Sequence, residues 1–294
     1  MNRYFANLGD VWKHLVLAEL LALEPPSEYW ETHAGSASYP LTHSPARDYG
    51  AYWYREHARE IPALAGSHYS AELDRLASES GGAGIYPGSA LWAMRALGDK
   101  GKYFFCDLDP ASTLSLRESA NQLGLGEQTR VLEGDGMTAA LAEATSYQGD
   151  PAGVFVTVDP FEPFAAAGSL SAIELASALI MRGFKVLYWY SYDVPEQRLF
   201  PMGMLREYAR ETGATVWCGD LMLASVLGRS EGEVEELLTG ADGPGAGCGV
   251  ICGNFQPTST ADCTRLGDGL ASAWREAKLP NGSSGALDFR AVEE

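Results

Sequence analysis

The sequence is poor in positive charge. Its 294 residues include 21 Lys and Arg against 39 Asp and Glu, which gives a formal net charge of −18 at pH 7. Proteins that bind nucleic acid without sequence preference rely on Lys and Arg side chains to displace phosphate counterions. This balance argues against an indiscriminate nucleic-acid binder, although a local basic groove is still compatible with it.

Long apolar runs and metal-ligand patterns are also missing. No stretch approaches the ~18 consecutive apolar residues that a membrane span requires. Asp10, Lys13 and His14 lie where a signal peptide would be continuously apolar. The five cysteines are scattered and odd in number, which fits a reducing compartment, and Cys248 and Cys252 have no nearby histidine to complete a metal site. We therefore expect a cytoplasmic protein with no membrane segment and no metal.

Apolar and aromatic residues are plentiful: 46% of the chain is hydrophobic, with 7 Trp, 14 Tyr and 10 Phe. Short β-rich runs alternate with helix-like segments at 111–123, 168–182 and 195–212. The runs predict seven strands, at 28–35, 103–109, 130–135, 154–160, 185–192, 215–223 and 248–255. Strands that alternate with helices predict an α/β protein whose largely parallel sheet is covered on both faces.

Three segments depart from this alternation. Residues 46–86 contain two helical patterns, and we expect a small helical insertion there, beside a main domain formed by 1–45 and 87–294. The linker 228–247 is acidic and glycine-rich, so we expect a short helix and a loop, with the last two strands antiparallel. The tail from about residue 280 is expected to be only loosely held.

Small or acidic residues follow four successive predicted strands. A turn of small residues at 34–38 follows the first strand, and Asp107, Asp135 and Asp159 follow the next three. Ligands of open parallel sheets bind outside the carboxyl ends of the strands, although one such acid alone is more often a helix cap. Four in order favour an adenosine-type cofactor. S-adenosylmethionine fits better than NAD, because no G-x-G-x-x-G follows the first strand.

Six short motifs resemble a known family in order and spacing. They are N-L-G-D-V-W-K-H (7–14), E-T-H-A-G-S-A-S-Y (31–39), Y-P-G-S-A (86–90), C-D-L-D-P (106–110), E-G-D-G (133–136) and V-D-P-F (158–161). Over nearly its whole length the chain resembles the large-subunit ribosomal RNA adenine-N6 methyltransferases of the RlmJ type. The resemblance implies a Rossmann-like seven-strand methyltransferase sheet with a small helical insertion, and S-adenosylmethionine as cofactor.

The resemblance also implies roles for individual residues. Those implied to bind the cofactor are Lys13, His14, His33, Gly35, Ser36, Ser89, Asp107, Asp135, Gly136 and Asp159. Asp159 and the Pro160 carbonyl would orient the acceptor amine, and Lys13, as a compact charge, would pair with the cofactor carboxylate. His33 is equally compatible with a hydrogen-bonded core histidine.

Two positions depart from the family pattern. Ala37 replaces a glycine in the turn after the first strand, which is tolerable if its φ is negative. The family's D-P-P-Y is D-P-F-E here, so Glu162 takes the place of the aromatic ring that would stack on the base, and Phe161 and Phe164 flank it. Glu162 is equally compatible with an exposed turn residue and with a group that binds a cationic or amine acceptor.

Two aromatic groups admit a structural and a functional interpretation. The aromatic residues at 49–54 are expected to form the packed face of the helical insertion. Those at 188–192 alternate along a predicted strand, so that half would be core and half would line the acceptor pocket. The sequence as a whole predicts an S-adenosylmethionine-dependent N-methyltransferase, monomeric or homodimeric. Its acceptor is either adenine N6 of ribosomal RNA or, as the acidity and Glu162 suggest, a small-molecule or peptide amine. A cofactor-binding module without catalysis is the third alternative.

Overall fold

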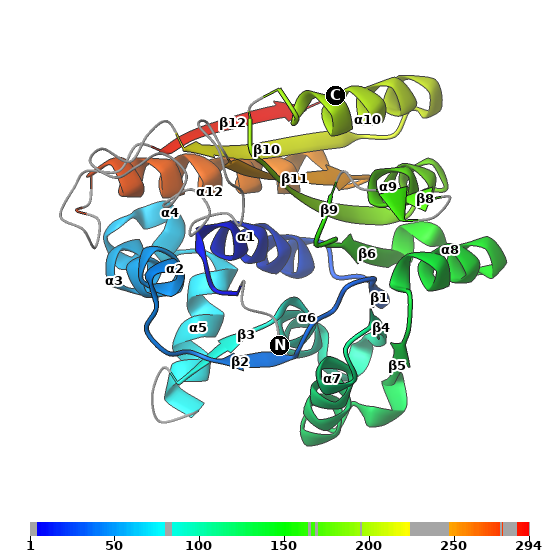
Figure 1. Cartoon of the computed structure of the whole chain (residues 1–294), viewed down its shortest axis with the longest axis horizontal. Coiled ribbons are helices and arrows are strands. Elements are labelled where there is room, and N and C mark those ends of the chain that lie inside the picture. Colours follow the sequence, from blue (N-terminus) through cyan, green and yellow to red (C-terminus); the bar gives the residue numbers. More distant parts are fainter. Residues whose placement is uncertain are drawn as a thin grey trace.

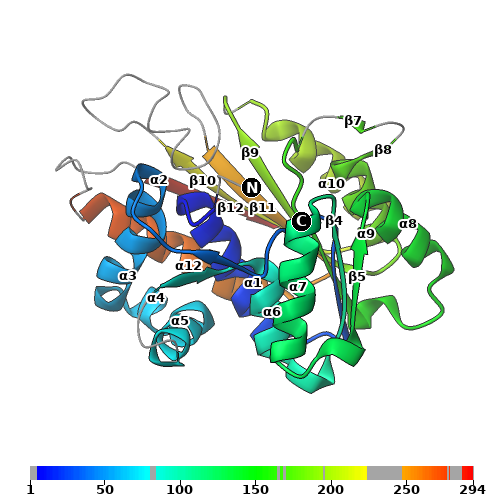
Figure 2. The ribbon, with the colours of Figure 1, turned by 60° about the horizontal axis from the view of Figure 1, so that its bottom comes forward.

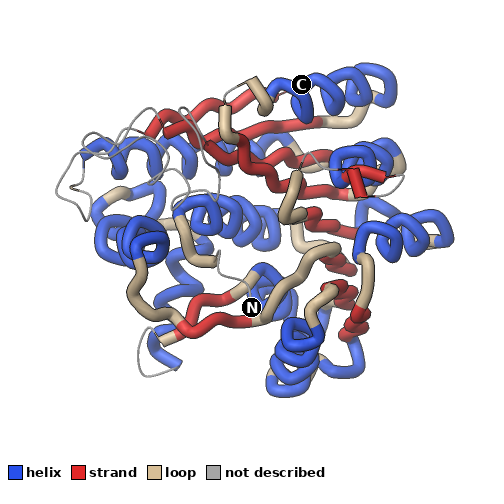
Figure 3. Tube along the Cα trace, in the orientation of Figure 1, coloured by secondary structure: helices blue, strands red, loops and turns tan. Residues whose placement is uncertain are grey.

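A sheet of eight strands forms the centre of the molecule, in the order β12-β10-β11-β9-β6-β1-β4-β5 (Figure 1). The computed structural model describes residues 5–79, 84–163, 166–167, 170–194, 196–223, 247–276, 278 and 287–293. The eight strands are β1 (Glu28–Glu31), β4 (Lys102–Asp107), β5 (Thr129–Glu133), β6 (Val154–Val158), β9 (Lys185–Tyr192), β10 (Val216–Leu223), β11 (Gly247–Gly253) and β12 (Leu287–Glu293). Figure 3 shows them stacked side by side, with helices around them.

Strand direction makes the sheet Rossmann-like, as predicted. β5, β4, β1, β6 and β9 are parallel, whereas β11 is antiparallel to both β9 and β10. The expected antiparallel final pair is therefore confirmed. β1 lies between β4 and β6, so the chain turns to opposite sides of β1 as it builds the sheet. Such a switch point leaves a crevice at the carboxyl ends of the strands.

Helices cover both faces of the sheet (Figure 2). Successive residues of β1 face opposite ways, so that Tyr29 packs in one buried cluster and Trp30 in the other. The first cluster includes residues of α1 (Leu8–Leu23), α6 (Ser89–Leu97), α7 (Pro110–Gln122) and α12 (Pro257–Glu276). The second includes residues of α8 (Gly136–Ser146), α9 (Ala172–Met181) and α10 (Leu199–Thr212). β6 is buried along its whole length, as a strand covered on both faces must be.

The first helix is buried on nearly every side. The Asn7 side chain caps α1 by accepting from the Asp10 backbone N–H at 2.8 Å. α1 packs against α5 (His68–Glu79), α6 and α12. Its charged residues Lys13 and Glu19 are therefore buried too. Buried charges need partners, and those of Lys13 lie in the cavity described below.

Residues 46–79, within the range where we expect an insertion, are largely helical, and the first half of them is broken into short pieces. These are α2 (Pro45–Arg47), the π-helical turn η1 (Asp48–Tyr52), α3 (Trp53–His57), the 3₁₀ turn η2 (Ala58–Glu60) and α4 (Pro62–Ala65). The strands β2 (Ser38–Pro40) and β3 (Ile85–Pro87), which flank the segment, pair antiparallel in a two-stranded sheet. The aromatic residues at 49–54 are indeed packed: Trp53 lies edge-on to Trp274 of α12, and Tyr54 edge-on to Tyr69. These helices share the core of the sheet's first face.

The expectation of a loosely held tail is wrong for its last residues. β12 pairs antiparallel with β10 and forms one edge of the sheet. Phe289 lies edge-on to Trp12 of α1, and a Cβ on Gly267 of α12 would come within 2.3 Å of the Phe289 ring. Close packing on a small residue therefore anchors the strand. Most of the linker 228–247 lies outside the described residues.

All five cysteines are buried and none forms a disulfide, and Cys248 and Cys252 share one face of β11, as expected. Among the helices that the structure describes, none is long and apolar enough to cross a membrane.

Candidate functional site

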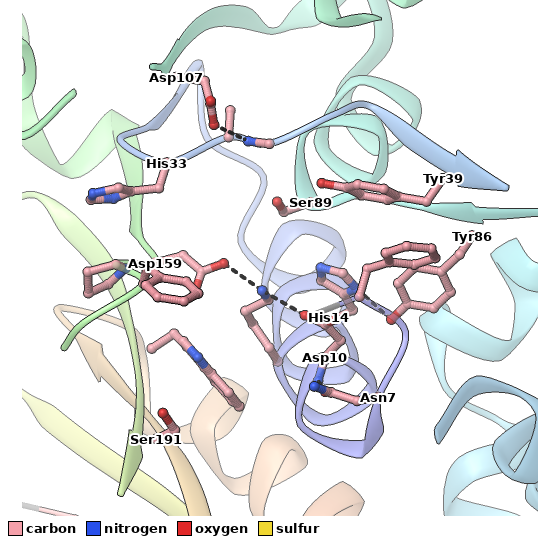
Figure 4. Close-up of a pocket in the computed structure, with 18 of the residues that line it drawn as sticks. Asn7, Asp10, His14, His33, Tyr39, Tyr86, Ser89, Asp107, Asp159 and Ser191 are labelled. Carbon is pink, nitrogen blue, oxygen red and sulfur yellow. Dashed lines mark hydrogen bonds and ion pairs between the residues drawn. The ribbon is translucent and has the colours of Figure 1, made fainter. Parts of the chain in front are cut away.

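A cavity of about 470 Å³ opens at the carboxyl ends of β1, β4, β6 and β9, where the sheet order reverses. The first turns of α1 form its floor, and the start of α6 and the turns after β1 and β6 form its walls. Predicted site residues that line it are Lys13, His14, His33, Gly35, Ser89, Asp107, Asp159, Pro160, Phe161 and Glu162. Residues distant in the sequence thus meet at one site (Figure 4).

Three of the predicted residues that the structure describes, Ser36, Asp135 and Gly136, do not line the cavity. Ser36 donates its backbone N–H to the Tyr39 hydroxyl at 2.9 Å. Asp135 is the N-cap of α8 and accepts from the Met137 and Thr138 backbone N–H groups and from the Thr138 hydroxyl. Gly136 packs on β1: a Cβ there would lie 1.9 Å from the Thr32 carbonyl oxygen. For Asp135 and Gly136 these contacts supply a structural role. Phe164 lies outside the described residues.

A buried ion triad joins α1 to the end of β6. The Lys13 ammonium lies 2.6 Å from Asp159 Oδ2 and 3.0 Å from Asp10 Oδ1. Asp159 and Asp10 face each other across this contact in Figure 4. Burial alone would lower the pKa of Lys13, but the two carboxylates outweigh it and raise the pKa well above its usual value. Lys13 is therefore a fixed ammonium rather than a base, and two carboxylates already neutralise it.

The Asp107 carboxylate is held in place by backbone groups. Its Oδ2 accepts from the Gly35 N–H and its Oδ1 from the Asp109 N–H, both at 2.8 Å. Gly35 has φ +59°, and a Cβ there would come within 2.4 Å of the Tyr39 hydroxyl, so this turn requires glycine. Ala37, by contrast, does not have positive φ, and the alanine is tolerated. Each oxygen of Asp107 keeps lone-pair capacity for a ligand hydroxyl.

Two histidines line the cavity in neutral form. Burial lowers the pKa of His33, although Asp159, Asp107 and Asp135 oppose the shift, and its Nδ1 lies 2.7 Å from the Thr32 hydroxyl. Burial lowers the pKa of His14 well below its usual range, and the neighbouring Lys13 charge adds to this. His14 Nδ1 lies 2.9 Å from the Tyr86 hydroxyl, and its Nε2 has no hydrogen-bond partner among the described residues.

The turn after β6 carries the divergent D-P-F-E segment. Phe161 lines the cavity yet is 79% exposed, and Glu162 is also exposed at the rim. The Tyr188 hydroxyl of β9 donates to the Pro163 carbonyl at 2.8 Å and fixes the end of the turn. A large exposed ring beside a cavity is suited to stacking on a planar ligand. Phe161 offers such a ring, one position before that of the family's aromatic residue.

Several lining residues were not predicted individually. Trp189 and Ser191 of β9 line the cavity, whereas Tyr190 and Tyr192 face the other buried cluster. The side chains of this strand do alternate, but the aromatic residues do not divide in half: only Trp189 lines the cavity, and Tyr188, Tyr190 and Tyr192 are core. The other additions are Phe5, Asn7, Asp10, Ala34, Tyr39, Tyr86 and Gly88. For Asp10 the signal was its i, i+3 spacing from Lys13 on one helix, which places the two side chains on the same face.

Metal ligands do not gather at this site. Within the described part of the chain, no group of three or more His, Cys, Asp or Glu side chains could hold a metal ion. The cavity chemistry comes instead from four carboxylates, those of Asp10, Asp107, Asp159 and Glu162, and from the one ammonium of Lys13. A ligand with positive charge or many N–H and O–H donors suits such a lining.

Comparison with known proteins identifies the fold. No family model and no curated protein matches the chain. The structure of protein LPL1258 from Legionella pneumophila, described with the family-model DUF519, is similar with a TM-score of 0.68 at 18% identity, over 98% of each chain. That similarity shows a shared fold across the whole length.

Two structures described as methyltransferases or bound to AdoMet match more weakly. A putative O-methyltransferase from Klebsiella pneumoniae has a TM-score of 0.39 at 13% identity, over 81% of this chain and 77% of that one. TYW2 from M. jannaschii, solved in complex with AdoMet, has a TM-score of 0.38 at 8% identity, over 86% and 77%. Scores this low add no argument about activity, which depends on the site itself.

Proposed function

We propose that the protein is an S-adenosylmethionine-dependent N-methyltransferase. The observation that carries this proposal is the convergence of the motif residues: Lys13, His14, His33, Ser89, Asp107 and Asp159 come from separate segments and line one cavity. The cavity lies at the switch point of a Rossmann-like sheet, where such folds bind adenosine-type cofactors. The resemblance to the RlmJ-type family rests on the same residues.

The lining residues fit this cofactor in size and chemistry. A cavity of about 470 Å³ is within the usual range for small-molecule sites. Asp107, fixed by two backbone N–H groups, can accept from the two ribose hydroxyls. The carboxylate-rich lining suits the sulfonium charge, and the unpartnered Nε2 of buried His14 is a polar atom that a ligand can satisfy. When bound, the cofactor supplies an activated methyl group.

Asp159 would orient the acceptor nitrogen. The Lys13 ammonium contacts Oδ2 of Asp159, so Oδ1 would accept from the N–H of the acceptor amine. The Pro160 carbonyl, from the next residue of the same turn, would accept the amine's second N–H. Two acceptors in fixed positions hold the nitrogen lone pair toward the methyl group, and catalysis is then mainly positioning.

The resemblance favours adenine N6 of ribosomal RNA as the acceptor. Phe161 supports this choice, because its exposed ring at the cavity rim can stack on a base. The protein would then act where ribosomes are assembled, in the cytoplasm. The charge of the lining favours the second candidate, a small-molecule or peptide amine, because Glu162 adds a fourth carboxylate where the family has an aromatic ring.

A methyl-transfer assay with labelled S-adenosylmethionine separates these candidates. Deproteinised large-subunit RNA from a strain lacking the protein is compared with a small-molecule extract of the same cells, and Asp159→Asn serves as the inactive control. Label on adenine N6 establishes the RNA acceptor. Label only in the extract, reduced by Glu162→Gln, establishes the amine. No label in either fraction contradicts methyl transfer and leaves a binding module.

A further inference from the structure

A chain of buried hydroxyl groups leads from the helical insertion to His14. The Tyr69 hydroxyl of α5 donates to the Tyr86 hydroxyl at 3.4 Å, and the Tyr86 hydroxyl lies 2.9 Å from His14 Nδ1. All three side chains are at most 3% exposed. Figure 4 shows the His14 ring between Tyr86 and Ser89, at the edge of the cavity.

The direction of these hydrogen bonds sets the tautomer of His14. Because the Tyr86 oxygen accepts the Tyr69 proton, its own proton is free to go to Nδ1. Nδ1 is then an acceptor, and a neutral ring must carry its proton on Nε2. The reverse direction would leave the buried Tyr69 proton without its acceptor, at a cost of roughly 1–3 kcal/mol, while Nε2 has no protein partner in either direction.

The charge state of His14 is consistent with this arrangement. Burial lowers the pKa of His14 well below its usual range, and Lys13, adjacent in the sequence, lowers it further. The ring is therefore neutral at pH 7, and its tautomer decides whether Nε2 donates or accepts. An Nε2–H group buried with no partner among the described residues is a donor that awaits a ligand.

The surroundings of His14 indicate which ligand group it meets. Gly88, the N-cap of α6, has no side chain to cap the helix, and both Gly88 and Ser89 line the cavity beside His14. The N–H groups in the first turn of a helix without a side-chain cap favour a negatively charged oxygen. Lys13 is the obvious cation for that role, but Asp10 and Asp159 already bind its ammonium. A carboxylate would instead meet neutral donors here.

We propose that Tyr86 and Tyr69 are positioning residues that hold neutral His14 in its Nε2–H tautomer, so that the ring and the start of α6 together bind the carboxylate end of the ligand. This inference rests on the proposed function for the identity of the ligand, S-adenosylmethionine or its product. The resemblance implied that Lys13 pairs with the cofactor carboxylate. The proposal assigns this contact instead to His14 and the start of α6, because Asp10 and Asp159 bind the Lys13 ammonium. The tautomer itself is a property of the protein alone.

The tautomer can be measured directly by NMR on protein labelled with ¹⁵N-histidine. We expect His14 to show a bare Nδ1 and a protonated Nε2 in the wild type, and to lose that single form in Tyr86→Phe. Tyr103→Phe is the matched control, because it removes a buried hydroxyl that donates to the Gly98 carbonyl on another part of the fold. A wild-type ring protonated on Nδ1, or an unchanged tautomer in Tyr86→Phe, overturns the proposal.

Binding measurements test the ligand contact separately. S-adenosylhomocysteine carries the carboxylate, and methylthioadenosine lacks the amino-acid end. We expect Tyr86→Phe to weaken S-adenosylhomocysteine by roughly 3- to 10-fold, the loss of about one hydrogen bond, and to leave methylthioadenosine unchanged. An equal loss for both ligands contradicts the carboxylate contact. If neither ligand binds the wild type, the proposed function fails, while the NMR result still decides the tautomer.

Discussion

Among single residues, Lys13, Asp10 and Asp159 form the ion triad on which the geometry of the proposed site depends. Lys13 carries a permanent charge between Asp10 and Asp159, so its contribution is to fix Asp159 rather than to move a proton. Sequence alone suggested Lys13 and Asp159 as separate site residues. The pairing of the two could not be predicted, because 146 positions separate them and only the packing of α1 against the sheet brings them together.

Replacing Asp159 with Asn tests its role in catalysis. The amide keeps the shape but turns one acceptor oxygen into a donor, so the amine loses its orientation. We expect turnover to fall by roughly 10²–10⁴-fold, the usual contribution of a positioned acid–base group. The affinity for S-adenosylmethionine, measured by calorimetry, should change far less. A comparable loss in both quantities would show that Asp159 serves cofactor binding alone.

Replacing Lys13 with Met tests the electrostatics of the triad. Asp10 and Asp159 would remain buried without their cation, at a cost of about 3–5 kcal/mol. Burial already raises the pKa of Asp10, and loss of the ammonium would raise it further. A carboxyl group whose folded pKa is raised binds its proton more tightly in the folded state, so its contribution to stability is lost as pH rises.

Urea unfolding of Lys13→Met and the wild type at pH 5.5 and pH 8 measures this effect. We expect the variant to lose more stability than the wild type between the two values, because only the variant has carboxylates without a counter-ion. Equal losses in the two proteins would mean that both carboxylates are well solvated without Lys13.

At the scale of elements, the insertion supports the beginning of α1. The backbone N–H of Ala51 in η1 donates to the Ala6 carbonyl at 2.9 Å, and Ala6 has φ +62°, an unfavourable conformation for alanine. A Cβ on Gly50 would come within 2.2 Å of that carbonyl oxygen. The π-helical turn thus clamps residues 5–7, two of which line the cavity.

The variant Gly50→Ala tests this clamp. Its methyl group would collide with backbone atoms, so we expect a loss of about 1–3 kcal/mol in the free energy of unfolding and weaker cofactor binding. Gly203→Ala in α10 is the control, since a Cβ there meets nothing within 4 Å and alanine is the better helix former. Equal stabilities for the two variants, measured by urea unfolding, would contradict the clamp.

Elements were predictable from the sequence where one periodic pattern decides the structure. Six of the seven predicted strands and the helix α7 follow the predicted ranges closely, since apolar runs, the Asp109 cap and Pro110 leave little choice, whereas β1 ends at Glu31, four residues before the predicted end. β12 was missed, because Leu287, Phe289 and Val292 are the only large apolar residues of a short segment that otherwise holds Asp, Arg, Ala and Glu. Its stability comes from the β10 edge and from the close approach of Gly267, neither of which is visible in local sequence.

At the scale of the whole molecule, the fold explains why distant motifs act together. The order of the sheet places the ends of β1, β4 and β6 side by side, and α1 crosses beneath them. The sequence therefore predicted most of the cavity wall. It did not single out Asp10 or Tyr86, because each is an ordinary helix or strand residue by local pattern, and only tertiary packing brings both to the cavity.

Calorimetric titration of the purified protein with S-adenosylmethionine tests directly whether this cavity binds the cofactor. We expect one site per chain, with affinity lowered at least 10-fold in Asp107→Ala, which removes both ribose-accepting oxygens. Glu118→Ala, a loss of an exposed carboxylate on α7, should leave the affinity unchanged. Undetectable binding to the folded wild type, or equal affinity in Asp107→Ala, would contradict the account.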